Sequence, residues 1–244
     1  MFIGLSTGCL YKNKGPISKD AINDISSTGC NAIELCAASK DRIYQLDSIS
    51  NSDLKAFDYV SLHAPDDVIF DGSTNAKMVL DEILKQHERL DFDLVVIHGH
   101  NVVSRNVLKN YNLPFAIENH DTHFGKNVAE MELVFKNFDG NMVLDVLHSY
   151  IAGKSSAELT KSMNDEFKNR IVQIHLSGLG VHDDSQQHYP IYITRQLDIL
   201  NSIPKNIPVI IESVLPKYDS IDKVLAELKN EYSYVKSYLL NGMK

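Results

Sequence analysis

The residues best suited to metal chemistry follow one another at the ends of apolar, β-branched runs along this 244-residue chain. Two further histidines, His148 and His188, come shortly after two of these runs. Imidazole and carboxylate together suit zinc, manganese or iron. A lone histidine after an apolar strand usually has a structural role, but six metal-ligand residues in succession indicate a polynuclear metal site. In chain order the six terminal residues are His63, His98, Glu118, Asp145, His175 and Glu212.

The elements that must position these residues are repeated strand–helix units. Because the carboxyl ends of the strands meet at one face of a closed barrel, the six residues would converge there. An open doubly wound sheet would instead gather its ligands at one switch point. The length is close to the ~250 residues of an eight-unit barrel. We therefore predict an α/β fold, a single (β/α)8 TIM barrel filling residues 1–244 as one domain. The expected strands are Phe2–Ser6, Ala32–Leu35, Tyr59–His63, Leu94–His98, Pro114–Glu118, Asn141–Asp145, Ile171–His175 and Ile207–Glu212.

Amphipathic stretches between these runs predict the helices. Gly29, Gly140 and Asn169 stand where three of them should stop. The unit between His98 and Pro114 leaves room for little more than one helical turn, around residues 104–109. The other expected helices are Ser18–Thr28, Ala76–Arg89, Val128–Asn137 and Ser156–Lys168.

Composition narrows the class of protein. The formal net charge of −8 argues against a surface built for nucleic acid. Cys9, Cys30 and Cys36 are odd in number and form no Cys-x-x-Cys pair, which suits a reducing cytoplasm and excludes a cysteine zinc site. No basic leader precedes the first strand, and no apolar run reaches the ~20 residues of a membrane span. We expect a soluble cytoplasmic enzyme domain without a membrane partner.

The order of these pieces resembles the xylose-isomerase-like barrel superfamily (AP endonuclease family 2), and within it the endonuclease IV branch, which cleaves DNA at abasic sites. The resemblance spans nearly the whole chain. Each piece is short, so the specificity comes from their order and from their placement at strand ends. The matching pieces are Leu62-His63-Ala64-Pro65, Val96-Ile97-His98-Gly99-His100, Ile117-Glu118-Asn119, Leu144-Asp145-Val146-Leu147-His148, Ile174-His175-Leu176-Ser177, Gln186-Gln187-His188 and Ile211-Glu212-Ser213.

The resemblance implies two or three divalent ions per chain, zinc first, with manganese or iron as alternatives. A first ion would take His63, His98 and Glu118. A second would take Glu118 as a bridge, with Asp145, His175 and Glu212. A third would take His148 and His188.

This chain departs from the family at the third ion. Gln186 replaces the family's acidic ligand, which would leave that ion weakly bound or completed by Asp183 or Asp184. The Gly-x-Gly segment that usually follows the last histidine is also replaced, by Tyr189-Pro190-Ile191-Tyr192.

Other polar residues have weaker assignments. His100 and His120 are expected to support ligands or contact substrate. Glu34 lies at the end of the second strand, where it could be a ligand, with a packing or hydrogen-bonding role as the equal alternative. Lys12, Lys14 and Gly15 could contact an anion, although a solvated loop is the simpler reading. Exposed positions are expected for His87, His123 and His182.

Two chemistries fit this set of residues, and both imply a small phosphorylated or sugar substrate. The preferred one is metal-dependent hydrolysis of a phosphate ester or diester, because His63 and His98 would hold an ion that an isomerase does not need. The alternative is isomerisation or epimerisation of a sugar or sugar phosphate. There Glu118 and Glu212 would be the catalytic residues that move the proton, and His148 would bind a hydroxyl. DNA is disfavoured as substrate because the acidic Asp66 and Asp67 follow His63-Ala-Pro. A barrel that binds metal without catalysis is a third reading.

Overall fold

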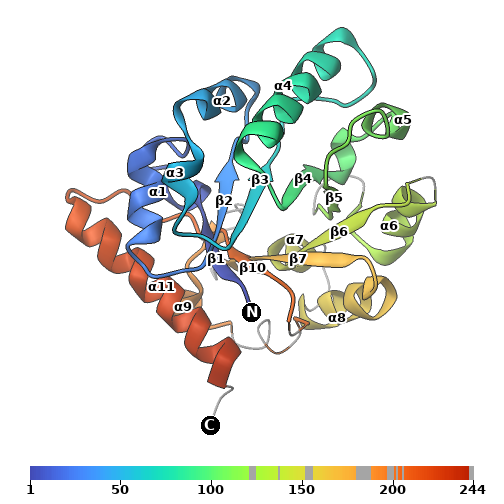
Figure 1. Cartoon of the computed structure of the whole chain (residues 1–244). Helices are drawn as coiled ribbons and strands as arrows, with labels where there is room; N and C mark the ends of the chain where they lie inside the picture. Colours follow the sequence, from blue (N-terminus) through green and yellow to red (C-terminus); the bar gives the residue numbers. More distant parts are fainter. Residues whose placement is uncertain are drawn as a thin grey trace.

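Eight parallel strands close into a barrel in the computed structural model of this chain. The structure describes residues 1–120, 125–136, 138–151, 156–179, 188–196, 201, 203–204 and 206–241. Each strand pairs with its neighbours along the chain, and the first pairs with the last, in the order β1-β10-β7-β6-β5-β4-β3-β2. Helices surround the strands (Figure 1). The predicted (β/α)8 TIM barrel is confirmed.

The strands lie where the apolar runs placed them, with small differences at their ends. The last strand is shorter than predicted: it covers Val209–Ile211, so that Ile207 and Pro208 precede it and Glu212 follows it. A two-stranded antiparallel pair, β8 with β9, lies between the last two barrel strands and was not predicted. The bounds are β1 Ile3–Ser6, β2 Ala32–Cys36, β3 Tyr59–His63, β4 Leu94–His98, β5 Phe115–Glu118, β6 Asn141–Asp145, β7 Ile171–Leu176, β8 Gly178–Leu179, β9 His188–Tyr189 and β10 Val209–Ile211.

The predicted helices are all present, and the structure adds several others. The longest, α11, runs along one side of the barrel (Figure 1) and was not predicted. Its apolar positions pack on β1 and on α9. The α-helices are α1 Lys19–Ser26, α2 Lys40–Gln45, α3 Asn51–Leu54, α4 Thr74–Leu90, α5 Arg105–Leu108, α6 Val128–Phe135, α7 Val146–Ile151, α8 Ser156–Phe167, α9 Ile191–Thr194 and α11 Ile221–Asn241; the 3-10 turns are η1 Thr7–Leu10, η2 Leu46–Ser48 and η3 Gly99–Asn101. No helix in the described part of the chain is long and apolar enough to cross a membrane.

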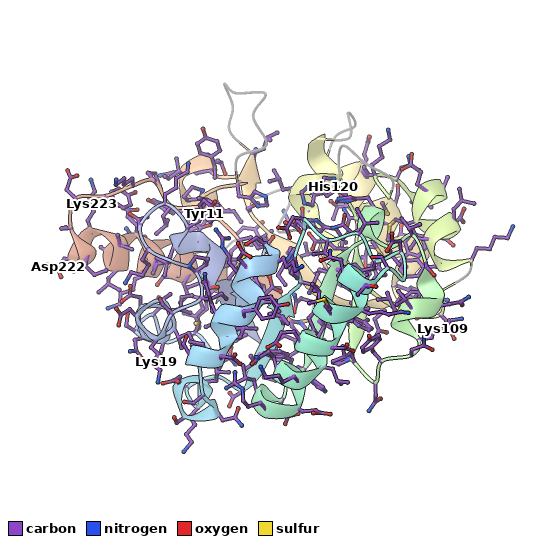
Figure 2. All side chains as sticks on the ribbon, turned by 90° about the horizontal axis from the view of Figure 1, so that it is seen from above. Tyr11, Lys19, Lys109, His120, Asp222 and Lys223 are labelled. Atoms are coloured by element: carbon purple, nitrogen blue, oxygen red, sulfur yellow. The ribbon has the colours of Figure 1, made fainter. Side chains whose placement is uncertain are left out.

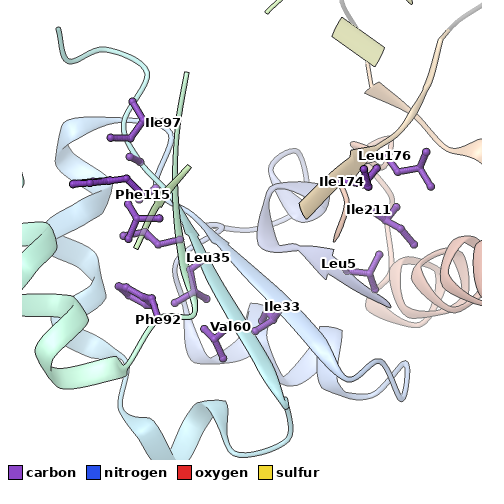
Figure 3. Packing of buried hydrophobic residues seen from close by; sticks show 14 of the residues in the cluster. Leu5, Ile33, Leu35, Val60, Phe92, Ile97, Phe115, Ile174, Leu176 and Ile211 are labelled. Atoms are coloured by element: carbon purple, nitrogen blue, oxygen red, sulfur yellow. The ribbon is translucent and has the colours of Figure 1, made fainter. Parts of the chain in front are cut away.

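Two apolar clusters show which strand residues face the inside of the barrel and which face the helices. The larger one lies between strands and helices and contains Val95 and Ile97 of β4 (Figure 3). The smaller one lies inside the barrel and contains Leu94 and Val96 of the same strand. Because successive side chains on a strand point to opposite faces, His98 continues the inward series. The same alternation turns the terminal residues of β3, β5 and β6 inward.

The alternation is interrupted once, in β7. The pairing with β6 steps from Ile171 directly to Gln173 and so skips Val172. This irregularity is typical of a β-bulge, which re-aims the residues that follow it. Gln173 and His175 consequently face the barrel interior, while Ile174 and Leu176 pack under the helices. Without the bulge, His175 would share a face with the outer core.

Close strand packing at Gly4 generates a stability prediction. A Cβ built on Gly4 would lie 2.2 Å from the carbonyl oxygen of Ala32 on the neighbouring strand, whereas one built on Gly15 would meet nothing within 4 Å. We expect Gly4→Ala to lower the free energy of unfolding by about 1–3 kcal/mol through overpacking. Gly15→Ala, the matched control, should change it by less than about 0.5 kcal/mol. Urea denaturation of both variants measures this. Equal stabilities would show that the barrel tolerates a side chain there.

Candidate metal centre

The barrel brings all eight predicted ligands to one end, the end at which the parallel strands finish. Most of them line a single cavity of about 290 Å³, and Asp145 and His175 lie fully buried among them. His120 and Tyr11 mark the rim of this end, toward the top of Figure 2, whereas Lys19 and Lys109 lie lower. His63, His98, Glu118 and Asp145 end β3 to β6, His175 lies in β7, Glu212 follows β10, His148 lies in α7 and His188 in β9. The lining ligands are His63, His98, Glu118, His148, His188 and Glu212.

Glu118 lies at the centre of the group with imidazole nitrogens on both of its oxygens. On one side, Oε2 lies 3.3 Å from His63 Nε2 and 3.6 Å from His98 Nε2. On the other side, Oε1 lies 3.3 Å from His175 Nδ1 and 3.7 Å from His148 Nε2. The same nitrogen of His175 lies 3.3 Å from Glu212 Oε2. Glu118 is therefore flanked by two separate sets of donors, one for each oxygen.

These spacings fit shared ions better than direct hydrogen bonds. Nitrogen–oxygen hydrogen bonds are mostly 2.7–3.2 Å long, and neither oxygen of Glu118 forms one with any described residue. Two donors bound to one zinc ion at about 2.0–2.2 Å lie roughly 3–3.5 Å apart. The buried clusters could therefore hold divalent ions.

Only one of the two carboxylate oxygens of Asp145 forms a hydrogen bond with a described residue. Its Oδ1 accepts a hydrogen bond from the His148 amide at 2.6 Å, while Oδ2 has no hydrogen-bond partner among the described residues. Asn119 fixes the strand end by accepting from the Asp145 amide at 2.8 Å and donating to its carbonyl oxygen at 2.9 Å. Ligand atoms of Glu118, Asp145, His175 and Glu212 all lie within 4.8 Å of one another. The free oxygen of Asp145 completes a four-residue cluster.

Three imidazoles that face Glu118 each have an acceptor on their other nitrogen. His63 Nδ1 donates to the Ala64 carbonyl oxygen at 2.9 Å, and His98 Nδ1 lies 3.0 Å from Asp66 Oδ1 without the geometry of a hydrogen bond. His175 Nε2 lies 3.0 Å from Glu34 Oε2 and 2.7 Å from the amide nitrogen of Gln173. An acceptor on one ring nitrogen fixes the proton there and leaves the other nitrogen as a metal ligand. At His63 the Ala64 carbonyl oxygen therefore selects the tautomer that ligation through Nε2 requires, whereas His175 Nε2 meets both an acceptor on Glu34 and a donor on Gln173.

Glu34 has a hydrogen-bonding role, which is one of the alternatives that the sequence left open for it. Its buried carboxylate also accepts from Ser61 Oγ at 2.9 Å and from Gln173 Nε2 at 2.8 Å. Tyr59 donates to Gln173 Oε1 at 2.9 Å, which extends the network beneath the site. Its place at the end of the second predicted strand was the only sequence signal for Glu34. The partner role of Asp66 was missed, although its spacing of three residues from His63 could have suggested it.

Charge interactions within the cluster set the protonation of the metal-free protein. Burial opposes ionisation of Glu118, but attraction by His175 and His98 outweighs it and holds the pKa of Glu118 well below its usual range. Burial likewise disfavours imidazolium at His98, yet Glu118 and Asp66 raise its pKa to about 10. Burial raises the pKa of Glu212 to about 7. Protons on the imidazoles thus supply the positive charge that the buried carboxylate needs.

The residues predicted for a third ion are only partly placed. The His188 ring lies 5.9 Å from that of His148, its Nδ1 lies 3.0 Å from Ser177 Oγ, and burial lowers its pKa to about 4. His120 lies closer, with its ring centroid 4.6 Å from that of His148. It also forms a cluster with His98 and His148 whose ligand atoms lie within 4.8 Å of one another. Asp183, Asp184, Gln186 and Gln187 lie outside the described residues.

The weaker assignments have mixed outcomes. His87 is half-buried and packs 6.2 Å from the Phe92 ring, so the prediction of an exposed residue is wrong. Lys14 pairs with Asp24, which occupies its ammonium group. Lys12 lines a second cavity of about 500 Å³ that adjoins the first at Tyr11. His123 and His182 lie outside the described residues.

Comparison with known proteins places the chain by its fold. No family model matches the sequence, and no curated protein matches it significantly. Among solved structures, endonuclease IV from Thermus thermophilus matches with a TM-score of 0.64 at 14% identity, covering 96% of this chain and 98% of that one. D-psicose 3-epimerase from Clostridium cellulolyticum matches with a TM-score of 0.64 at 15% identity, covering 98% and 99%. A sugar phosphate isomerase/epimerase from Parabacteroides distasonis matches with a TM-score of 0.60 at 13% identity, covering 99% and 95%.

Identities of this size show a shared fold alone. The similar structures include both an enzyme named endonuclease IV and enzymes named as epimerases, so they do not select one activity. They agree with the resemblance inferred from the strand-end residues at the level of architecture. The fold of this chain is a closed barrel of eight parallel strands surrounded by helices, the fold it has in common with these endonuclease and epimerase structures.

Proposed function

We propose that this protein is a metal-dependent hydrolase that cleaves a phosphate ester or diester in a small substrate. The observation that carries the proposal is the arrangement around Glu118, with His63 and His98 on one oxygen and His175 on the other. A carboxylate flanked in this way can bridge two ions. Paired ions about 3.5–4 Å apart are typical of enzymes that displace groups at phosphorus.

The chain's own residues divide into two ligand sets. His63, His98 and Glu118 would hold one ion, and Glu118, Asp145, His175 and Glu212 would hold the other. Zinc suits the mixture of imidazole and carboxylate, with manganese or iron as alternatives. Bound ions would supply stabilisation of the developing charge on phosphate oxygens and would acidify a water molecule.

The surrounding residues prepare both sets for this task. Asp66 and the Ala64 carbonyl oxygen hold the imidazoles of the first set, and Glu34 holds His175 in the second. Such partners orient the rings and raise their basicity. The cavity above them measures about 290 Å³, at the small end of the range for single bound ligands. We infer a small molecule as substrate.

Nucleic acid is the less favoured substrate. The chain carries a formal net charge of −8, and Asp66 and Asp67 are both exposed at the rim beside the cavity. A surface for a phosphate backbone needs lysine or arginine instead.

Isomerisation or epimerisation of a sugar or sugar phosphate is the second candidate. One observation favours it: Glu118, Asp145, His175 and Glu212 form a cluster that is complete without His63 and His98. In that reaction Glu118 and Glu212 would move the substrate proton. These two carboxylates approach the same nitrogen of His175, each at 3.3 Å.

Loss of the first ligand set distinguishes the two candidates. We expect metal-replete protein to release phosphate from at least one member of a panel of phosphomonoesters, phosphodiesters, abasic-site DNA and sugar phosphates. The double variant His63→Ala/His98→Ala should then lose turnover by about 10³-fold, several kcal/mol in the barrier, because the ion that helps to activate water is lost. It should retain the other ion. His87→Ala, in α4, is the matched control.

The assay of the double variant is made at saturating substrate. A near-normal maximal rate with one ion retained would reject hydrolysis and favour the isomerase. If the double variant loses both ions as well as its activity, the assay is repeated with His63→Ala and with His98→Ala. Hydrolysis then requires that each single variant alone reduces the maximal rate severely.

Metal affinity should rise with pH because protons compete for the ligands. Burial disfavours imidazolium at His63 and His175, but neighbouring carboxylates raise the pKa of both well above the usual value, as at His98. These rings carry protons at neutral pH in the metal-free protein and must lose them to bind an ion. Titration with Mn²⁺ from about pH 6 to about pH 9 should show affinity increasing roughly tenfold per pH unit for each displaced proton. Flat affinity over this range would contradict the histidine ligation.

A further inference from the structure

One wall of the metal cavity carries no candidate metal ligand. Apart from His148 in α7 and His188 in β9, the predicted donors come from β3 to β7 and from the end of β10, whereas β1 and β2 contribute Ser6 and Cys36 at the corresponding inward positions. Above these two strand ends, the cavity is lined by Tyr11 and Arg42. In the ring of eight strands, β1 and β2 stand opposite β5 and β6, which carry Glu118 and Asp145. Arg42 therefore lines the side of the cavity that lies across from the strand ends of Glu118 and Asp145.

Arg42 is held in place by an aromatic ring rather than by a carboxylate. Its guanidinium carbon lies 4.5 Å from the centroid of the Tyr11 ring, a cation–π contact. Arg42 is half-buried on α2, while Tyr11 is 56% exposed at the mouth of the cavity. No ion pair joins Arg42 to a carboxylate among the residues that the structure describes. Stacking fixes the plane of the guanidinium and leaves its N–H groups available for a ligand.

Arg42 is also the one lysine or arginine among the described residues that line this cavity. The nearby basic side chains are engaged or lie elsewhere: Lys14 pairs with Asp24, Lys40 bonds Asn75, and Lys12 lines the adjoining cavity. A planar guanidinium binds carboxylate or phosphate through two parallel hydrogen bonds, with a geometry that lysine cannot match. The chemistry of this wall thus fits an oxyanion.

We propose that Arg42, oriented by Tyr11, binds a second anionic group of the substrate, across the cavity from the phosphate that is cleaved. The inference rests on the proposed hydrolase function, since it assigns the scissile phosphate to the metal side. The substrate class is then a small molecule with two anionic groups, such as a sugar bisphosphate or a phosphorylated sugar acid. A cavity of about 290 Å³ accommodates one such molecule.

Binding of matched probes to metal-loaded protein tests this assignment by calorimetry. Phosphogluconate and sorbitol phosphate differ only in a carboxylate that replaces a hydroxymethyl group, and fructose bisphosphate carries a second phosphate instead. We expect at least one of the two probes with two anionic groups to bind about tenfold or more tightly than sorbitol phosphate, as charge-assisted hydrogen bonds allow. Which of them does so distinguishes a carboxylate site from a phosphate site.

The variants assign that preference to a residue. Arg42→Gln should remove it while leaving the affinity for sorbitol phosphate and the metal content unchanged, and Arg42→Lys should retain part of it. Lys12→Gln removes a charge from the adjoining cavity and should have no effect. If a substrate is turned over, Arg42→Gln should raise KM more than it lowers kcat.

Three results would overturn the proposal. They are the absence of any preference in the wild-type protein, a preference that survives in Arg42→Gln, and an equal loss of affinity for sorbitol phosphate in that variant. The last would place the single phosphate at Arg42, as an isomerase requires. Phosphate release is scored separately. A preference that depends on Arg42 without any phosphate release would reject the hydrolase and keep the anion site. Phosphate release without a preference that depends on Arg42 would reject only the anion site.

Discussion

The buried carboxylate of Glu118 is the constraint on which the site depends. It is 1% exposed, and an ionised carboxylate taken out of water is strongly destabilising unless positive charge compensates it. Four imidazole nitrogens approach its two oxygens within 3.3–3.7 Å. In the metal-free protein that compensation comes from protonated histidines, and divalent ions could replace those protons. The ligand nitrogens of these histidines could therefore carry either protons or metal ions, but not both at once.

Strand register is what holds this arrangement in place. His98 pairs with Glu118 across β4 and β5, and Asp145 pairs with His175 across β6 and β7. A slip of one residue on any of these strands would turn its predicted metal ligand into the outer core. The polar network beneath the site adds a second constraint, because Glu34 joins β2 to His175 on β7. Barrel closure and ligand convergence are thus consequences of one pattern of pairing.

Much of this site could be predicted from the sequence because it follows from local rules. Alternation along Leu94–His98 gives both a strand and the inward phase of His98. Contacts between distant segments could not be predicted in this way. Glu34 and His175 are 141 residues apart, and Arg42 meets Tyr11 only because β1 and β2 are neighbours. The half-buried position of His87 depends likewise on Phe92, which follows its helix.

The most direct test of the account is a count of bound ions in Glu118→Gln. Elemental analysis and metal titration would compare it with the wild-type protein, with His63→Ala and with Glu132→Gln, an exposed control on α6. The account predicts two ions in the wild type and the control, and loss of one in His63→Ala. In Glu118→Gln, affinity for both ions should weaken by about tenfold or more, because an amide is a poor ligand beside a carboxylate. Retention of both ions at wild-type affinity in Glu118→Gln would contradict the bridging role.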